Sequence, residues 1–137
     1  MTTSAMKPRA AAVVVRDGHL LVIHRRKHGT EYFTLPGGGV EAGESAAQAC
    51  ARELEEEAGL QVVVGKCLLI LENAGRTEHY FAADAPTRDV RLGGEEAQHN
   101  SPTNQYTLKW LPLAELAATD LKPAAAKAVI VKRMEVR

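Results

Sequence analysis

The chain has 137 residues and carries 17 basic and 17 acidic side chains, so its net charge gives no argument for a nucleic-acid or membrane partner. This length predicts a single domain, residues 1–137, large enough to bury a hydrophobic core. The first residues lack the apolar segment of a signal peptide, and no apolar run approaches membrane-spanning length. Cys50 and Cys67 have no metal-motif spacing, so we expect reduced thiols and a cytoplasmic location.

The first third of the chain predicts a hairpin that leads into a glycine-rich loop. Residues 10–16 and 19–25 are rich in β-forming residues, and Asp17–Gly18 between them is typical of a hairpin turn. Residues 32–35 predict a short third strand. The glycines at residues 37–39 follow it, and they predict a loop whose backbone can approach a ligand closely.

A helix is predicted at residues 45–58. Ser45 is its expected N-cap, and Gln48 three residues later completes a capping box. Gly59 stands where a glycine commonly ends a helix. Apolar residues recur at helical spacing beside the acidic ones, so this helix can dock on a core while presenting its acids.

The second half of the chain predicts three strands and two helices around a polar loop. In chain order these are strands at residues 61–71, 78–84 and 106–111, and helices at residues 113–118 and 123–136. Residues 73–75 are expected to turn between the first two strands, and residues 93–105 to form a flexible loop. This order predicts an α/β fold with helices packed on a mixed sheet.

The predicted helix after the glycine loop carries a high density of acid. Glu53, Glu56 and Glu57 lie three and four positions apart and share one helix face, whereas Glu55 projects to the opposite side. Like charges this close destabilise a bare helix. Carboxylate oxygens are the ligands that Mg²⁺ and Mn²⁺ prefer, so the pattern predicts a divalent-cation site. Arg52 lies next to Glu56 on the helix surface and could hold or orient an acid.

The segment from residue 38 to residue 60 resembles the Nudix box, G-x5-E-x7-R-E-U-x-E-E-x-G-U, in which U is a bulky aliphatic residue. Its specified positions are filled by Gly38, Glu44, Arg52, Glu53, Leu54, Glu56, Glu57, Gly59 and Leu60. The preceding hairpin, the Leu-Pro-Gly-Gly entry and a later strand ending in Trp-Leu-Pro are also similar to the family. The resemblance implies the Nudix fold, an α/β/α sandwich with a mixed β-sheet.

The resemblance also implies a hydrolase that cleaves a diphosphate linkage in a nucleoside diphosphate derivative, with water as the nucleophile. It assigns four residues to catalysis: Arg52, Glu53, Glu56 and Glu57. The three glutamates would carry Mg²⁺ or Mn²⁺, with the carbonyl of Gly37 as a further ligand, and Gly38 would lie against the substrate. One of the acids would accept the proton of the water, and Glu53 is favoured for this role.

Further contacts are expected outside the box. Family members often place another glutamate in a later loop, which implies Glu96 as a metal ligand, with Glu95 as the alternative. A basic residue at the end of the strand facing the box often meets phosphate, which implies substrate binding by Arg25. Arg26 and Lys27 compete for that role, and each of these side chains is also consistent with an ordinary solvated position.

The substrate stays open because the markers that separate subfamilies are missing. Residues 76–78 read Arg-Thr-Glu where many ADP-ribose hydrolases have a proline and many diadenosine polyphosphate hydrolases a tyrosine. Nucleoside triphosphates, ADP-ribose or nucleotide sugars, and dinucleoside polyphosphates all remain, with a compact MutT-like hydrolase of an intact or damaged (d)NTP left by elimination. The alternative is a non-catalytic Nudix-fold module that binds a nucleotide or regulates a partner. Strand residues near the N-terminus could pair across a homodimer or close the sheet.

Overall fold

The computed structural model describes residues 6–90 and 101–135. The elements in chain order are β1 (Arg9–Arg16), β2 (His19–Lys27), β3 (Thr30–Thr34), β4 (Gly37–Gly39), α1 (Ala46–Ala58), β5 (Val63–Asn73), β6 (Arg76–Asp84), β7 (Asn104–Pro112), the 3₁₀ helix η1 (Leu113–Ala118) and α3 (Ala124–Glu135). All the predicted strands and helices are present, and β4 is an addition. Within the two described ranges, no helix has the length and apolar character that a membrane span requires.

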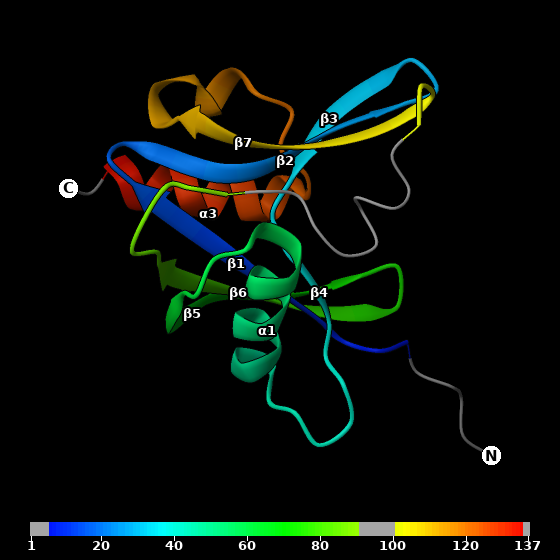
Figure 1. The fold of residues 1–137 in the computed structure, drawn as a ribbon, viewed down its shortest axis with the longest axis vertical. Helices are drawn as coiled ribbons and strands as arrows, with labels where there is room; N and C mark the ends of the chain where they lie inside the picture. The colour runs from blue at the N-terminus through cyan, green and yellow to red at the C-terminus, as the bar shows by residue number, and fades with distance from the viewer. Residues whose placement is uncertain (1–5, 91–100, 136–137) are drawn as a thin grey trace.

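Strand β1 holds the sheet together and gives it its mixed character (Figure 1). It pairs in parallel with β6, with Val13 opposite Ala82. It pairs antiparallel with β4 at its start and with β2 at its end. Strand β5 extends the sheet beyond β6, and β3 and β7 both pair with β2. The predicted mixed sheet is therefore confirmed.

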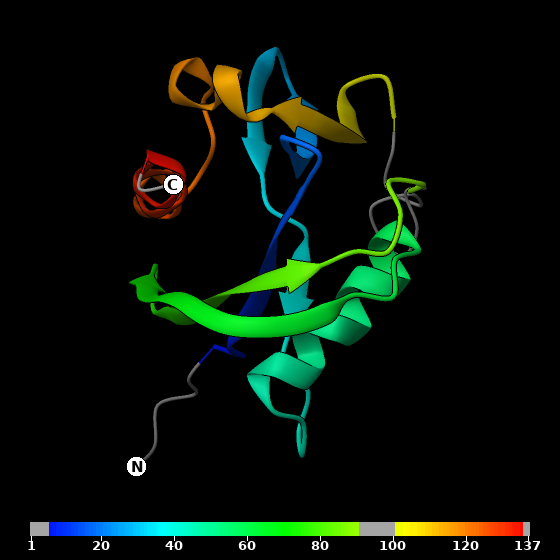
Figure 2. The ribbon, with the colours of Figure 1, turned by 90° about the vertical axis from the view of Figure 1, so that its left-hand side faces the viewer.

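Side chains of β1 alternate between two hydrophobic cores because successive residues of a strand point to opposite faces. Ala10, Ala12 and Val14 pack in the core that contains α1. Ala11 and Val13 pack in the core that contains η1 and α3. Figure 2 shows α1 and α3 on opposite sides of β1, so the predicted α/β/α sandwich is confirmed.

Three two-residue turns shape the hairpins. Asp17–Gly18 has φ values of 52° and 75°, as expected for the predicted turn. Ala74–Gly75, at 54° and 84°, joins β5 to β6 within the predicted turn segment. His28–Gly29, at 49° and 83°, was not predicted. It joins β2 directly to β3, which for this reason begins at Thr30, earlier than expected.

Two loop predictions are corrected. The glycines of β4 form a strand because Gly37 pairs with Ala11 of β1, a contact with a distant segment that overrides the low strand propensity of glycine. Of the loop predicted at residues 93–105, residues 93–100 lie outside the described residues. The last two positions of that range, Asn104 and Gln105, belong to β7, where they pair with the end of β2.

Both cysteines are free thiols, as predicted. Cys50 lies fully buried on the inner face of α1, and this burial raises the pKa of its thiol to about 12. Cys67 is half-buried on β5 and donates a weak hydrogen bond to the carbonyl of Leu69 at 3.7 Å.

Candidate active site

Helix α1 is held at both ends and along one face. The hydroxyl of Ser45 accepts from the amide of Gln48 at 3.0 Å, and the Gln48 side chain accepts from the amide of Ser45 at 2.9 Å. Gly59 ends the helix in the left-handed conformation, with φ of 70°. Leu54 is fully buried, which stabilises the docked helix by about 2 kcal/mol. These contacts confirm the predicted caps and fix which face of α1 carries its acids.

The acids of α1 lie in different surroundings. Glu57 is 3% exposed, and its Oε1 accepts from the amide of Gly37 at 2.9 Å. The Glu53 side chain is mostly buried, and that of Glu56 is exposed. Glu55 points away from this group and accepts from the side-chain amide of Gln61 at 3.2 Å. The predicted separation of Glu55 from the other acids is therefore observed.

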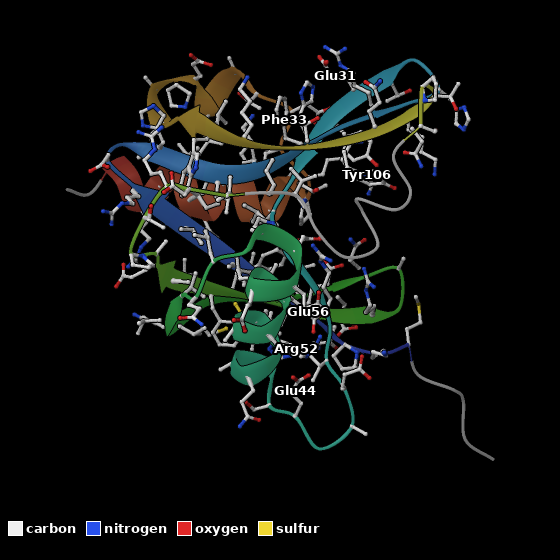
Figure 3. All side chains as sticks on the ribbon, viewed as in Figure 1. Glu31, Phe33, Glu44, Arg52, Glu56 and Tyr106 are labelled. Atoms are coloured by element: carbon white, nitrogen blue, oxygen red, sulfur yellow. The ribbon has the colours of Figure 1, made fainter. Side chains whose placement is uncertain are left out.

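Arg52 bridges four groups around the acidic face of α1. Its Nε and Nη2 donate to the carboxylate of Glu44 at 2.8 and 3.0 Å. Its Nη1 donates to Glu53 at 3.0 Å and to Glu56 at 3.2 Å, and Nη2 also donates to the carbonyl of Gly39 at 2.9 Å. Figure 3 shows Arg52 between Glu44 and Glu56. Arg52 thereby offsets the repulsion among acids that the sequence places side by side.

The pair between Arg52 and Glu44 perturbs both groups. Hydrogen bonds from Arg52, and then from the amide of Glu41, lower the pKa of Glu44 from 4.5 to about 2. The same pair raises the pKa of Arg52 above its ordinary value. Glu44 remains charged at any pH at which the protein would work.

Strand β4 lies directly against the acids. A Cβ atom built at Gly38 would stand 2.3 Å from the carboxyl carbon of Glu53, so only glycine leaves room for that carboxylate. The neighbouring Gly37 lies against the backbone of β1. A Cβ atom at Gly37 would stand 2.3 Å from the carbonyl oxygen of Ala10. The glycines of β4 thus let α1, β4 and β1 approach one another closely.

The acids face a polar cavity of about 440 Å³, which we call the acidic pocket. It is lined by Lys7, Arg9, Gly37, Gly38, Gly39, Glu41, Arg52, Glu53, Glu56, Glu57 and Arg76. Basic side chains from β1, from β6 and from the segment before β1 therefore meet the acids of α1. A pocket that combines carboxylates with cations suits an anionic ligand that is bound together with a metal ion.

A second cavity of about 550 Å³ shares Arg9 and Arg76 with the acidic pocket. It is lined by Arg9, Arg25, Tyr32, Thr34, Leu35, Asn73, Arg76, Glu78, Tyr80, Asp120, Leu121, Lys122, Pro123 and Ala124. The two cavities lie next to each other along the start of β1 and β6. Together they can accept a ligand longer than a diphosphate.

Arg25 lines the second cavity and not the acidic pocket. Its Nη2 donates to the hydroxyl of Tyr106 at 2.7 Å, and its guanidinium lies 4.3 Å from the centre of that ring. Figure 3 shows Tyr106 on β7, apart from the acids of α1. The competing Arg26 is exposed and pairs with Glu31 at 2.8 Å. Arg25 is therefore held on the β7 side of the second cavity, outside the acidic pocket.

The basic residues that join the two cavities, Arg9 and Arg76, were not predicted from the sequence. Arg76 donates to the buried Glu78 at 3.3 Å, and Tyr80 donates to the other oxygen of Glu78 at 2.5 Å. Burial, and then Glu78, raise the pKa of Tyr80. Residues 76, 78 and 80 alternate along β6, so the strand pattern could have placed them on one face. The parallel register that sets Arg9 opposite Glu78 has no signal in the sequence.

Comparison with known proteins decides the family. The NUDIX domain profile matches residues 6–131, nearly the whole chain. The CTP pyrophosphohydrolase of Escherichia coli strain K12 is 32% identical over 118 residues, which cover 83% of this chain and 82% of that relative. The chain belongs to the Nudix hydrolase family. The enzyme class predicted from the Nudix box is thereby confirmed.

Other similarities extend the comparison. The octanoyltransferase of Myxococcus xanthus is 34% identical over 116 residues, but the match covers 75% of this chain and only 31% of that relative. The name of that relative therefore describes a protein much longer than the segment that matches this chain. The crystal structure of a NUDIX hydrolase from Nitrosomonas europaea has a TM-score of 0.76 at 18% identity, covering 99% of this chain and 74% of the other. This likeness shows the shared Nudix fold.

The residues of the Nudix box fit a hard divalent cation, although they are not arranged as a ready metal site. Across residues 6–90 and 101–135, no three acidic, histidine or cysteine side chains converge as metal ligands. Arg52 engages Glu53 and Glu56, and the amide of Gly37 engages Glu57. The three carboxylates nevertheless line one pocket and supply only oxygen donors, as Mg²⁺ and Mn²⁺ prefer. The predicted further ligand Glu96, and its alternative Glu95, lie outside the described residues.

Proposed function

We propose that this Nudix hydrolase cleaves a diphosphate linkage in a nucleoside diphosphate derivative, in a reaction that depends on Mg²⁺ or Mn²⁺. One observation carries the proposal: Glu53, Glu56 and Glu57 of the box line the same pocket as Arg9 and Arg76. A phosphate chain needs cations, and a metal ion needs carboxylates. The acidic pocket offers both within one cavity.

The metal would be held by Glu53, Glu56 and Glu57, with the backbone of Gly37 beside them. When bound, such an ion neutralises phosphate charge and lowers the pKa of a coordinated water. Arg52 would act through the acids, because its contacts hold the carboxylates of α1 in position before the metal enters. Glu53 would accept the proton of the attacking water, and its position is set by the absence of a side chain at Gly38.

The substrate would span both cavities. Arg9 and Arg76 line each of them, so they can contact the phosphates nearest the nucleoside while the nucleoside enters the second cavity. Arg25 would then contact the nucleoside end of the substrate. The E. coli relative is named for a nucleoside triphosphate substrate, which supports a nucleotide for this chain as well. ADP-ribose, nucleotide sugars and dinucleoside polyphosphates are also candidate substrates.

The proposal is tested by a hydrolysis screen of the purified protein in which the products are separated and identified by chromatography, because cleavage of a diphosphate linkage gives phosphomonoesters or pyrophosphate rather than inorganic phosphate. Nucleoside triphosphates, oxidised deoxynucleoside triphosphates, ADP-ribose, nucleotide sugars and dinucleoside polyphosphates are each offered with Mg²⁺, with Mn²⁺ and with EDTA. The Glu57→Gln variant should lose about 100-fold or more in kcat, because the amide removes a charge that the metal needs. Glu55→Gln, on the opposite side of α1, is the matched control and should keep full activity.

The outcomes separate the enzyme from the binding module. Metal-dependent hydrolysis that is lost in Glu57→Gln and kept in Glu55→Gln supports the proposal and names the substrate class. Nucleotide binding by calorimetry without turnover of any member of the panel would favour the non-catalytic module. Turnover that persists in EDTA would contradict the role of the metal.

A further inference from the structure

Lys7 occupies space that exists only because residue 39 is glycine. The backbone around it is fixed, since the amide of Val40 donates to the carbonyl of Pro8 at 2.8 Å and Arg9 pairs with Gly39 between β1 and β4. A Cβ built at Gly39 would stand 2.6 Å from Cδ of Lys7. The Lys7 side chain therefore lies across Gly39 and lines the acidic pocket.

The ammonium of Lys7 is available to a ligand. Its Nζ lies 3.1 Å from Oε2 of Glu41, and both side chains are more than half exposed. Exposed pairs of this kind contribute little stability and are screened by salt, so a phosphate oxygen can replace Glu41. By contrast, the guanidinium of Arg52 is already engaged by three carboxylates and a carbonyl.

The position of Lys7 indicates which part of the substrate it meets. Arg9 and Arg76 line both cavities, whereas Lys7 lines only the acidic pocket. A phosphate chain whose nucleoside enters the second cavity reaches the two arginines first and Lys7 last. The group at that end is a terminal phosphate in a nucleoside triphosphate, and an esterified phosphate in a nucleotide sugar.

We infer that Lys7 binds the free terminal phosphate of a nucleoside triphosphate, and that this contact makes triphosphates the preferred substrate class. The inference rests on the proposed function. A free terminal phosphate carries more negative charge and more unsubstituted oxygens than an esterified one. An ammonium with three donors therefore distinguishes the two.

The test compares a nucleoside triphosphate with a nucleoside diphosphate sugar of the same base. Lys7→Met should raise KM for the triphosphate about tenfold and leave kcat within about twofold, because the lost contact is made equally in the ground state and in the transition state. The nucleotide sugar should be nearly unaffected. Lys7→Arg, which keeps the charge, should restore most of the affinity. Lys66→Met, which removes an exposed lysine on β5, is the matched control.

Gly39→Ala provides a second and independent variant. The added methyl group occupies the place of Lys7 Cδ, so it should push the flexible lysine aside and raise KM for the triphosphate as Lys7→Met does. In the Lys7→Met background the same change should have no further effect, since methionine can turn away. Equal losses from Gly39→Ala in both backgrounds would mean that Gly39 acts independently of Lys7, which overturns the inference.

Binding of a non-hydrolysable triphosphate analogue, measured by calorimetry with Mg²⁺, separates the two possible failures. Lys7-dependent binding without turnover would contradict the proposed function and leave the terminal phosphate contact standing. Turnover with a triphosphate KM that is the same in wild type and Lys7→Met would overturn the inference and leave the hydrolase standing. Equal rises in KM for the triphosphate and the nucleotide sugar would refute the preference for a free phosphate.

Discussion

Gly38→Ala is expected to inactivate the enzyme without unfolding it. The new Cβ would stand 2.3 Å from the carboxyl carbon of Glu53 and 2.4 and 2.5 Å from its oxygens. Ordinary contacts of a Cβ begin at 3.4 Å, so the carboxylate has to retreat by about 1 Å. It can do so by rotating its own side chain, because it stands at the far end of a flexible residue, and its contact with Arg52 at 3.0 Å then changes as well. The substitution therefore moves a functional group and leaves the backbone where it was.

Gly38→Ala should lower the catalytic rate much more than it lowers the stability of the fold. A displacement of 1 Å in a catalytic constellation can cost about 100-fold in rate, which corresponds to about 2.7 kcal/mol in the activation free energy. The melting temperature should change by less than about 3 °C, because no backbone contact is lost. Gly38→Ala therefore tests what the position of Glu53 contributes to the rate without a large change in the stability of the fold.

The assay measures kcat, KM and melting temperature for the best substrate of the screen. Gly65→Ala is the matched control, since a Cβ there would lie 3.4 Å from the carbonyl oxygen of Ala82, an ordinary contact. It should retain both activity and stability. A folded Gly38→Ala protein with wild-type kcat would refute the reasoning, because the reaction would then tolerate a displaced Glu53.

Two further predictions concern stability. Gly37→Ala places a Cβ 2.3 Å from the carbonyl oxygen of Ala10 and 2.6 Å from the Cα of Ala11. Because backbone cannot turn away, it should lower the free energy of unfolding by about 1 to 3 kcal/mol or more. Urea unfolding followed by circular dichroism measures this loss, and an unchanged midpoint would contradict the close approach of β4 to β1. Glu44→Gln tests the effect of pH, since Arg52 lowers the pKa of Glu44 from 4.5 to about 2 in the folded protein. A carboxylate whose pKa is lowered on folding stabilises the protein fully when the pH is above its ordinary pKa. This stabilisation is lost as the pH falls toward the pKa of the folded state. The wild type should therefore melt higher than Glu44→Gln at neutral pH, and the two melting temperatures should converge as pH falls through this window. A difference that stays constant across the window would refute the assignment.

Local patterns in the sequence were enough to predict the helix of the Nudix box and the faces on which its acids lie. Helical spacing is a local rule, so residues three and four positions apart share a face wherever the helix packs. The caps at Ser45 and Gly59 obey rules of the same kind and were found where predicted. The strands of the hairpins were also predictable, because alternation and turn residues are local signals. The family resemblance added the fold and the reaction class that the comparisons support.

The residues from distant segments that join these acids could be identified only in the folded structure. Three glycines predict a loop, and they form β4 only because β1 offers its backbone as a partner. The parallel pairing of β1 with β6 places Arg9 beside Arg76 and Glu78, from segments far apart in the chain. Arg25, which the resemblance assigns to the substrate, lines the second cavity and donates to Tyr106 of β7. Such contacts depend on strand register and on the packing of separate layers, which local periodicity does not encode.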